Sequence, residues 1–190
     1  MKYVPLWAVL LVMLVVFSGC DISGGSSYNS GGSSTSIATG QNGTGGTPNW
    51  GVQTKTSGCV ASGGLQDFAC TPGAIFPDAT SAQICVSGYS GSVRNVPTST
   101  KNQAYAEYGI TSHATGEYEV DHLVSLELGG SNDISNLWPE LASPKPGFHE
   151  KDKVENYLHD QVCSGAMTLK NAQVQVATNW LDVYNRMPNK

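Results

Sequence analysis

The stretch YEVDHLVSLELGGSNDISNLWPE, residues 118–140, combines an alternating run of apolar and polar residues with ionisable groups that packing does not require. Alternation is typical of a strand with one buried face, so the first half predicts a strand. The glycine pair 129–130 permits a tight reversal, and ISNLWPE then forms the returning arm of a hairpin. Because a hairpin can bury valine and leucine without charged neighbours, Asp121 and His122 indicate a function.

Asp121 and His122 together have the side-chain chemistry of a phosphodiester-cleaving site. A phosphodiester is anionic and repels hydroxide, so its hydrolysis needs a divalent metal to neutralise charge and a base to deprotonate water. Aspartate offers a hard oxygen ligand, and histidine offers a base with an ordinary pKa of about 6.5. Because neighbouring strand residues point to opposite faces, both side chains can serve one site only if the chain bends at this position.

Two further segments are expected to complete this site. Asn136, on the returning arm, can hydrogen-bond back across the loop and hold the geometry of the histidine. Residues 148–163, FHEKDKVENYLHDQVC, carry apolar side chains at helical spacing, and Asp152 and Glu155 fall on the opposite face. We expect that exposed acidic face to supply the remaining metal ligand.

The other segments predict a mixed α+β domain. AQICVSGYSGSVRNV, residues 82–96, alternates and is rich in β-branched residues, which favours a strand or a short hairpin through about Arg94. Residues 98–109 begin with Thr and Ser and end with glycine, which indicates a helix. A final helix is expected from about Thr168, where apolar residues recur at helical spacing.

Residues 1–20 have the features of an export signal. A positive start precedes an apolar run that contains proline and is shorter than the ~20 residues of a spanning helix. FSGC, ending at Cys20, resembles the lipobox of bacterial lipoproteins, with Phe17 in place of the usual aliphatic residue. The resemblance implies lipidation of Cys20 and a membrane anchor, and Asp21 resembles an inner-membrane retention signal. An ordinary cleaved signal and a short uncleaved anchor are the alternatives, and all three place the remainder outside the cytoplasm.

Residues 21–57 are almost wholly Ser, Gly, Thr and Asn. Such a stretch buries too little apolar area to offset its backbone entropy, so it predicts a flexible tether. The folded domain is therefore expected to occupy residues 58–190, a length that suits one domain with one modest core.

Four cysteines remain in this body, an even number that predicts two disulfides in an oxidising compartment. Three pairings are possible. We favour Cys59 with Cys70, closing a short Gly-rich loop, and Cys85 with Cys163, tying an early strand to a late helix. A four-cysteine zinc site is the alternative, but the sequence contains no Cys-x-x-Cys spacing.

The blocks VDHLVSLELGG and DISNLWPE resemble the HNH endonucleases, a family built on a ββα-metal motif. Over about residues 71–180 the chain is also similar to a group of exported bacterial HNH-type proteins, through TPGA, ICVSGY, KDKVEN and VCSG in addition. The resemblance implies an HNH-like core in which His122 is the general base and Asp121 is a metal ligand. It assigns to Asn136 the orientation of the loop and of the histidine.

The third metal ligand is where the chain departs from the family pattern. The helix position that the family uses falls on Lys145, which cannot coordinate a metal while it is protonated. We rank Asp152 first, then His149, then Glu155. Oxygen ligands favour Mg²⁺ or Mn²⁺, whereas His149 would shift the preference toward Zn²⁺ or Ni²⁺. The treble-clef cysteines of many HNH domains are missing from the sequence, and the two disulfides are expected to stabilise the domain instead.

The overall charge argues against a conventional surface for duplex binding. The chain has 10 Lys and Arg against 15 Asp and Glu, a formal net charge of -5. Its sequence contains no cluster of basic residues that would release counterions from a nucleic acid. Either a metal and a few cations such as Arg94 and Lys101 hold the substrate, or the substrate is not long duplex DNA.

These observations predict a metal-dependent endonuclease, a hydrolase of phosphodiester bonds in DNA or RNA, held in the cell envelope. Its predicted partners are a nucleic-acid substrate and, through the lipid anchor, a membrane; no protein partner is predicted. The alternative is a non-catalytic envelope lipoprotein that keeps the HNH-like hairpin for packing and serves as a binding module.

Overall fold

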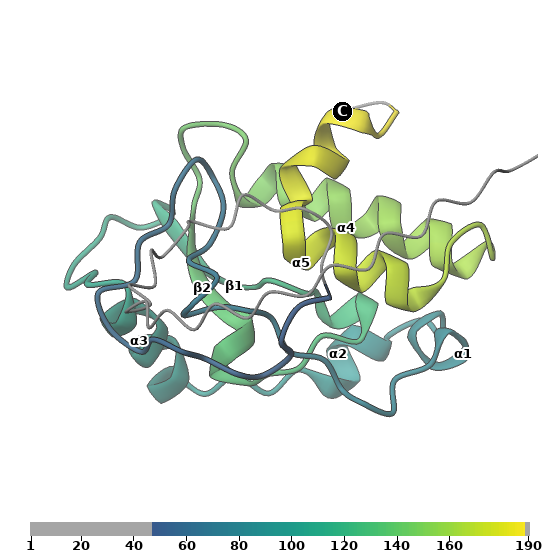
Figure 1. The fold of residues 1–190 in the computed structure, drawn as a ribbon, viewed down its shortest axis with the longest axis horizontal. Coiled ribbons are helices and arrows are strands. Elements are labelled where there is room, and N and C mark those ends of the chain that lie inside the picture. Colours follow the sequence, from purple (N-terminus) through teal and green to yellow (C-terminus); the bar gives the residue numbers. More distant parts are fainter. Residues whose placement is uncertain (1–46, 189–190) are drawn as a thin grey trace, which may run out of the picture. The chain divides into compact units, whose positions relative to one another are not determined.

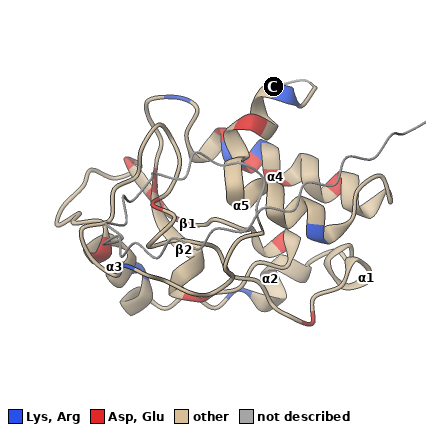
Figure 2. Ribbon diagram, in the orientation of Figure 1, with Lys and Arg blue, Asp and Glu red and all other residues tan. Residues whose placement is uncertain are grey.

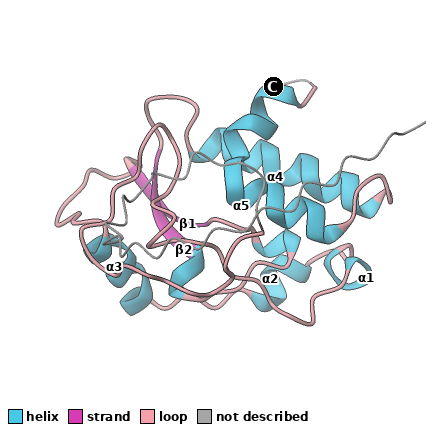
Figure 3. Cartoon of the chain, viewed as in Figure 1, coloured by secondary structure: helices cyan, strands magenta, loops and turns pink. Residues whose placement is uncertain are grey.

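The computed structural model describes residues 47–188. The export signal and lipobox predicted for residues 1–20, with the lipidation site Cys20, lie outside the described residues. Helices surround a two-stranded antiparallel sheet (Figures 1 and 3), so this part of the chain is a small α+β domain. The elements, in chain order, are α1 (Ser81–Ile84), α2 (Tyr89–Val93), α3 (Thr98–Glu107), β1 (Tyr118–His122), η1 (Leu126–Leu128), η2 (Ile134–Asn136), β2 (Leu137–Leu141), α4 (Phe148–Cys163) and α5 (Leu169–Arg186).

The folded body includes residues that composition places in the tether. Trp50 packs against the hydrophobic core. The side-chain amide of Gln53 donates hydrogen bonds to the backbone carbonyl of Cys70 at 2.8 Å and to the Glu107 carboxylate at 2.9 Å. Backbone hydrogen bonds from Gly51 to Gly73 and from Thr54 and Lys55 to Ala69 add to these contacts, so residues 47–57 belong to the folded domain.

Strands β1 and β2 pair in a register that places Asp121 opposite Trp138 and His122 opposite Leu137. Opposed residues in an antiparallel ladder have side chains on the same face, and successive residues alternate between faces. Asp121 and Trp138 therefore share one face of the hairpin, and His122 leaves from the other. Trp138 is 1% exposed and belongs to the core.

The two glycines between the hairpin arms have different roles. Gly129 ends η1 with φ +74°, in the left-handed region that glycine adopts without a steric penalty. Gly130 lies so close to the backbone that a Cβ there would be 1.7 Å from the carbonyl oxygen of Val124. Its backbone N–H donates to the carbonyl of Ser125 at 2.9 Å. Gly129 supplies the left-handed conformation of the turn, and Gly130 lets its own backbone approach that of Val124 and Ser125 closely.

Helices α4 and α5 pack along each other and form the main core with the hairpin loop (Figure 1). Trp138 from β2 and Trp180 from α5 are the largest fully buried side chains. Burial of such apolar surface is the dominant favourable contribution to folding. Other fully enclosed members of this core are Leu123, Val124, Leu128, Val154, Leu158, Ala172 and Val176.

Residues 82–96 contain helical segments, so the strand or hairpin predicted there is wrong. Thr80 caps α1, because its hydroxyl accepts from the backbone N–H of Gln83 while the Gln83 side chain accepts from the backbone N–H of Thr80. Gly88, with φ +85°, then precedes α2. A reciprocal cap and a left-handed glycine override the β-branched composition. The helices predicted at 98–109, at 148–163 and from about Thr168 are present as α3, α4 and α5.

Both favoured disulfides are present. Cys59–Cys70 closes a loop with a sequence separation of 11, and Cys85–Cys163 joins the end of α1 to the end of α4 with a separation of 78. Such bonds are typical of an oxidising, extracytoplasmic compartment. Within residues 47–188, no helix combines the length and the apolar character needed to cross a membrane.

We predict that the two disulfides contribute unequally to stability. Cross-linking removes more entropy from the unfolded chain when the closed loop is longer, so the Cys85→Ala/Cys163→Ala protein should lose about 4 to 5 kcal/mol and the Cys59→Ala/Cys70→Ala protein about 3 kcal/mol. Urea unfolding of the two variants beside the oxidised wild type measures both losses. An equal loss, or the reverse order, would contradict the prediction.

Candidate functional site

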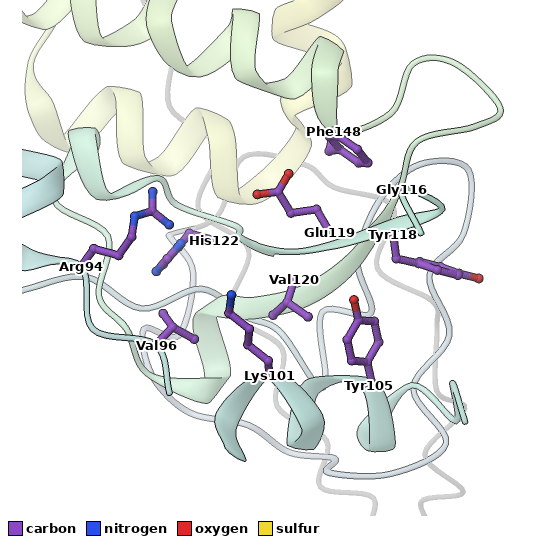
Figure 4. A pocket seen from close by; sticks show the side chains of 10 residues that line it. All are labelled: Arg94, Val96, Lys101, Tyr105, Gly116, Tyr118, Glu119, Val120, His122 and Phe148. Carbon is purple, nitrogen blue, oxygen red and sulfur yellow. The ribbon is translucent and has the colours of Figure 1, made fainter. Parts of the chain in front are cut away.

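A cavity of about 400 Å³ is lined by residues of β1, of α3 and of the segment after α2 (Figure 4). The Arg94 guanidinium and the His122 imidazole lie at one end of it, Lys101 and Glu119 lie near its middle, and Tyr118 lies at the other end. The cavity therefore combines one histidine with two cationic side chains. No hydrogen bond or ion pair engages either cation within residues 47–188, so both remain available to an anion.

The ring of His122 is held in one tautomer by Asn132. The Asn132 amide donates from Nδ2 to the Val93 carbonyl at 2.8 Å, which fixes its orientation, and its Oδ1 accepts from the backbone N–H of Asn95 at 3.1 Å. The same Oδ1 lies 3.3 Å from His122 Nε2. An amide oxygen only accepts, so this network assigns the hydrogen to Nε2 and leaves Nδ1 as the basic nitrogen.

Burial lowers the pKa of His122 from its ordinary 6.5 to about 4. The Asp121 carboxylate opposes this shift, and the cations Arg94 and Lys151 add to it. The imidazole is therefore neutral at pH 7, the form in which it can accept a proton. Burial, with 3% of the residue exposed, keeps the ring neutral although the hydrogen bond to Asn132 favours its protonated form.

We predict that two-bond ¹H–¹⁵N spectra at pH 7 show His122 as a fixed Nε2–H tautomer that titrates with a pKa of about 4. The unfolded chain binds this proton near pH 6.5, so the free energy of unfolding should fall as the pH drops from 6.5 through 4. In Asn132→Ala the tautomers should mix. Titration of the wild-type imidazole near its ordinary pKa would show that the ring is not desolvated, and mixed tautomers in the wild type would show that the Asn132 network is not formed.

Asp121 and Glu155 converge on the ammonium group of Lys151. Its Nζ donates to Asp121 Oδ2 at 2.8 Å, to the backbone carbonyl of His122 at 2.7 Å and to Glu155 Oε1. Asp121 Oδ1 accepts from the backbone N–H of His122 at 2.7 Å. The Lys151 side chain is fully buried, and its three donors meet three acceptors, which is the condition for a buried charge to be tolerated.

This buried cluster contains one ammonium and three carboxyl groups. Burial alone would lower the pKa of Lys151, but the neighbouring carboxylates raise it, Asp121 and Glu155 most. Burial would likewise raise the pKa of Asp121, but Lys151 holds it below its usual range. Burial raises the pKa of Glu155 and of Glu140, whose two oxygens find no hydrogen-bond partner among residues 47–188. Lys151 thus keeps Asp121 ionised, while the surplus carboxyls favour their neutral forms.

Lys151→Met should destabilise the domain strongly. Removing one partner of a buried ion pair leaves the other unpaired, which costs about 3 to 5 kcal/mol. Lys153→Met is the matched control, since that side chain is half exposed and its nearest carboxylate oxygen, on Glu150, is 3.9 Å away; it should change stability by about 0.5 kcal/mol or less. Urea unfolding compares them, and equal losses would mean that the buried pair is not formed.

Asn136 closes the loop between the hairpin arms, as the sequence predicts. Its Nδ2 donates to the carbonyls of Val124 and Ser131, at 2.9 and 2.8 Å, and its Oδ1 accepts from the backbone N–H of Val124 at 2.9 Å. The residue is fully buried. None of its side-chain hydrogen bonds within the described chain reaches His122, so Asn136 positions the loop that follows the histidine rather than the ring itself.

The three helix residues ranked as metal ligands lie in different environments. Glu155 is 8% exposed and belongs to the buried cluster, so its predicted place on an exposed face is wrong. His149 is exposed, and its ring packs on Phe148 with centroids 4.3 Å apart. Asp152 is exposed, and partial burial and the charge of Asp121 both raise the pKa of its carboxyl. Only Asp152 combines accessibility with proximity to Asp121.

Asp121, Asp152 and Glu119 act on one another electrostatically. Partial burial raises the pKa of Glu119, and the charges of the other two carboxylates raise it further. Their oxygens do not gather within 4.8 Å of one another in the described chain, so they make an open set rather than a closed cage. Mg²⁺ is commonly held by one or two carboxylates together with water and substrate phosphate. Both oxygens of Asp121 are already engaged, Oδ2 by Lys151 and Oδ1 by the backbone N–H of His122, so the carboxylates open to a hard divalent cation are the exposed Asp152 and Glu119.

Two other groups of potential ligands are explained by the disulfides. Each contains a bonded cysteine pair, and a disulfide sulfur is not the thiolate that binds zinc. The groups are Cys85, His159 and Cys163, and Cys59, Asp67 and Cys70.

The sequence alone does not single out two residues of this site, Lys151 and Asn132. Lys151 and Glu155 are spaced i, i+4 and share the apolar stripe of Val154 and Leu158, so their burial follows from the helical period. Asn132 lies in a polar loop and gives no comparable signal, because its partners come from the segment after α2.

Basic side chains are few and dispersed over several elements in Figure 2. No family model, no curated protein and no solved structure matches the chain.

Proposed function

We propose that this domain is a metal-dependent phosphodiesterase that acts as an endonuclease on nucleic acid outside the cytoplasm. The observation that carries the proposal is a neutral histidine with a basic Nδ1 in a cavity that also contains Arg94 and Lys101. A general base and a pair of cations match an anionic ester attacked by water. The HNH-like arrangement of hairpin and helix is part of this proposal.

In this mechanism His122 Nδ1 takes the proton from the attacking water, and Asn132 keeps the ring in the required tautomer. Arg94 and Lys101 bind the non-bridging oxygens of the phosphate. Lys151 fixes both the Asp121 carboxylate and the carbonyl of His122, so the strand end cannot shift during the reaction.

Asp152 and Glu119, beside the Asp121 carboxylate that Lys151 holds, would bind the divalent cation, Mg²⁺ or Mn²⁺. Such an ion, when bound, neutralises charge on the phosphodiester and stabilises the leaving oxygen. Partial burial and the charge of Asp121 raise the pKa of Asp152, and burial and the charges of Asp121 and Asp152 raise that of Glu119; a cation among these groups would relieve the repulsion, which supports this assignment. The oxygen-only donor set favours Mg²⁺ or Mn²⁺ over Zn²⁺ or Ni²⁺.

The test uses residues 41–190, a compact unit that contains the whole described core and both disulfides. Plasmid DNA and RNA are incubated with this protein in Mg²⁺, in Mn²⁺ and in EDTA at low salt. We expect cleavage that requires metal and falls roughly 10²- to 10⁴-fold in His122→Ala, the usual contribution of a general base. His149→Ala is the matched histidine control and should retain the wild-type rate.

Cleavage by His122→Ala at the wild-type rate would remove the histidine from the mechanism. If the wild-type protein cleaves neither polymer under any of these conditions, the non-catalytic binding module is the better description.

A further inference from the structure

The end of the cavity opposite His122 is aromatic. Tyr105 and His113 stack with ring centroids 4.6 Å apart and an interplanar angle of 28°, and His113 meets Tyr118 edge-on at 5.9 Å. Tyr105 and Tyr118 line the cavity, Tyr105 with its hydroxyl pointing inward, and Phe148 lines it from the first turn of α4 (Figure 4). We call Tyr105, His113 and Tyr118 the aromatic cluster.

The aromatic cluster is not part of the hydrophobic core. Its three members come from α3, from the loop after it and from β1, and none belongs to the core cluster of buried residues. His113 is exposed, and both tyrosines are half-buried. Core packing therefore does not account for three rings that meet beside a cavity with cationic side chains.

We propose that the aromatic cluster binds an unpaired base, so that the substrate of this site is single-stranded nucleic acid. This inference rests on the proposed phosphodiesterase function. The phosphate lies at Arg94, Lys101 and His122, and a base of the same strand stacks at Tyr105 and Tyr118, along the length of one cavity. Stacking on aromatic side chains accepts any base, because every base has a π-face.

The charge of the protein favours the same substrate class. Duplex binding depends on many phosphate contacts, and this cavity offers two cations in a chain of net charge -5. Stacking supplies affinity that does not depend on charge, but only to bases whose faces are free, and in a duplex these faces are covered by neighbouring pairs. A cavity of about 400 Å³ is also of the size that holds a small ligand rather than a double helix.

Binding is measured with the His122→Ala protein in EDTA, so that no probe is cleaved. The probes are a fluorescent oligothymidylate, its duplex with oligodeoxyadenylate, and an abasic strand of equal length that carries the phosphodiesters without bases. We expect the oligothymidylate to bind roughly 5- to 150-fold more tightly than either of the others, which is the range that stacking of one base implies. Tyr105→Ala/Tyr118→Ala should abolish this preference and leave binding of the abasic strand unchanged.

Tyr105→Phe/Tyr118→Phe is the matched control, because it keeps both rings and should keep the preference. Near-UV circular dichroism and urea unfolding check that each variant is folded. Equal binding of the three probes, binding of none, or a preference that survives removal of both rings would overturn the inference. Because no step requires cleavage, a protein that prefers the single strand but hydrolyses nothing supports this recognition and refutes the proposed hydrolysis.

Discussion

The buried ammonium of Lys151 is the contact on which the arrangement of the site depends. It joins two elements: on β1 it binds the Asp121 carboxylate and the backbone carbonyl of His122, and on its own helix α4 it binds Glu155 in the next turn. A charge with no exposed surface tolerates little displacement, because each lost hydrogen bond would leave a desolvated donor. The ion pair thus sets the register of helix against strand and brings the neighbouring Asp152 to the open side of Asp121.

The histidine is held by a different segment. Asn132 is anchored on the backbone on either side of Arg94, at Val93 and Asn95, and its oxygen faces the His122 ring. The side chain of Asn132 therefore positions both the general base, His122, and the segment that carries the neighbouring cation, Arg94. Since the imidazole is neutral in spite of a carboxylate next to it, desolvation outweighs the charge of Asp121 at this position.

The pairing of the two strand segments, three of the helices and both disulfides could be predicted from the sequence, because each leaves a local pattern: alternation, helical spacing, and an even cysteine count. The tight reversal predicted at the glycine pair is wrong, because β1 ends at His122 and a longer connection that contains η1 and η2 leads to β2. The role of Asn136 in bridging its own loop was predictable for the same reason. The helices around Cys85 were not, because a reciprocal cap at Thr80 outweighs β-branched composition. The burial of Glu155 could not be predicted from its charge, because it depends on the ion pair with Lys151 one turn earlier. Asn132 could not be found, since its partners lie far away in sequence.

The bond between Cys85 and Cys163 has a consequence for survival outside the cell. Every side chain assigned to the site, from Arg94 to Asp152, lies between these two cysteines, so all of them belong to one covalently closed ring of chain. A protease that cuts a single exposed loop within that ring opens it without releasing a fragment, and the nicked protein keeps every group it needs as one molecule. Loss of a piece of the site requires two cuts within the ring, or one cut together with a reductant that opens the disulfide.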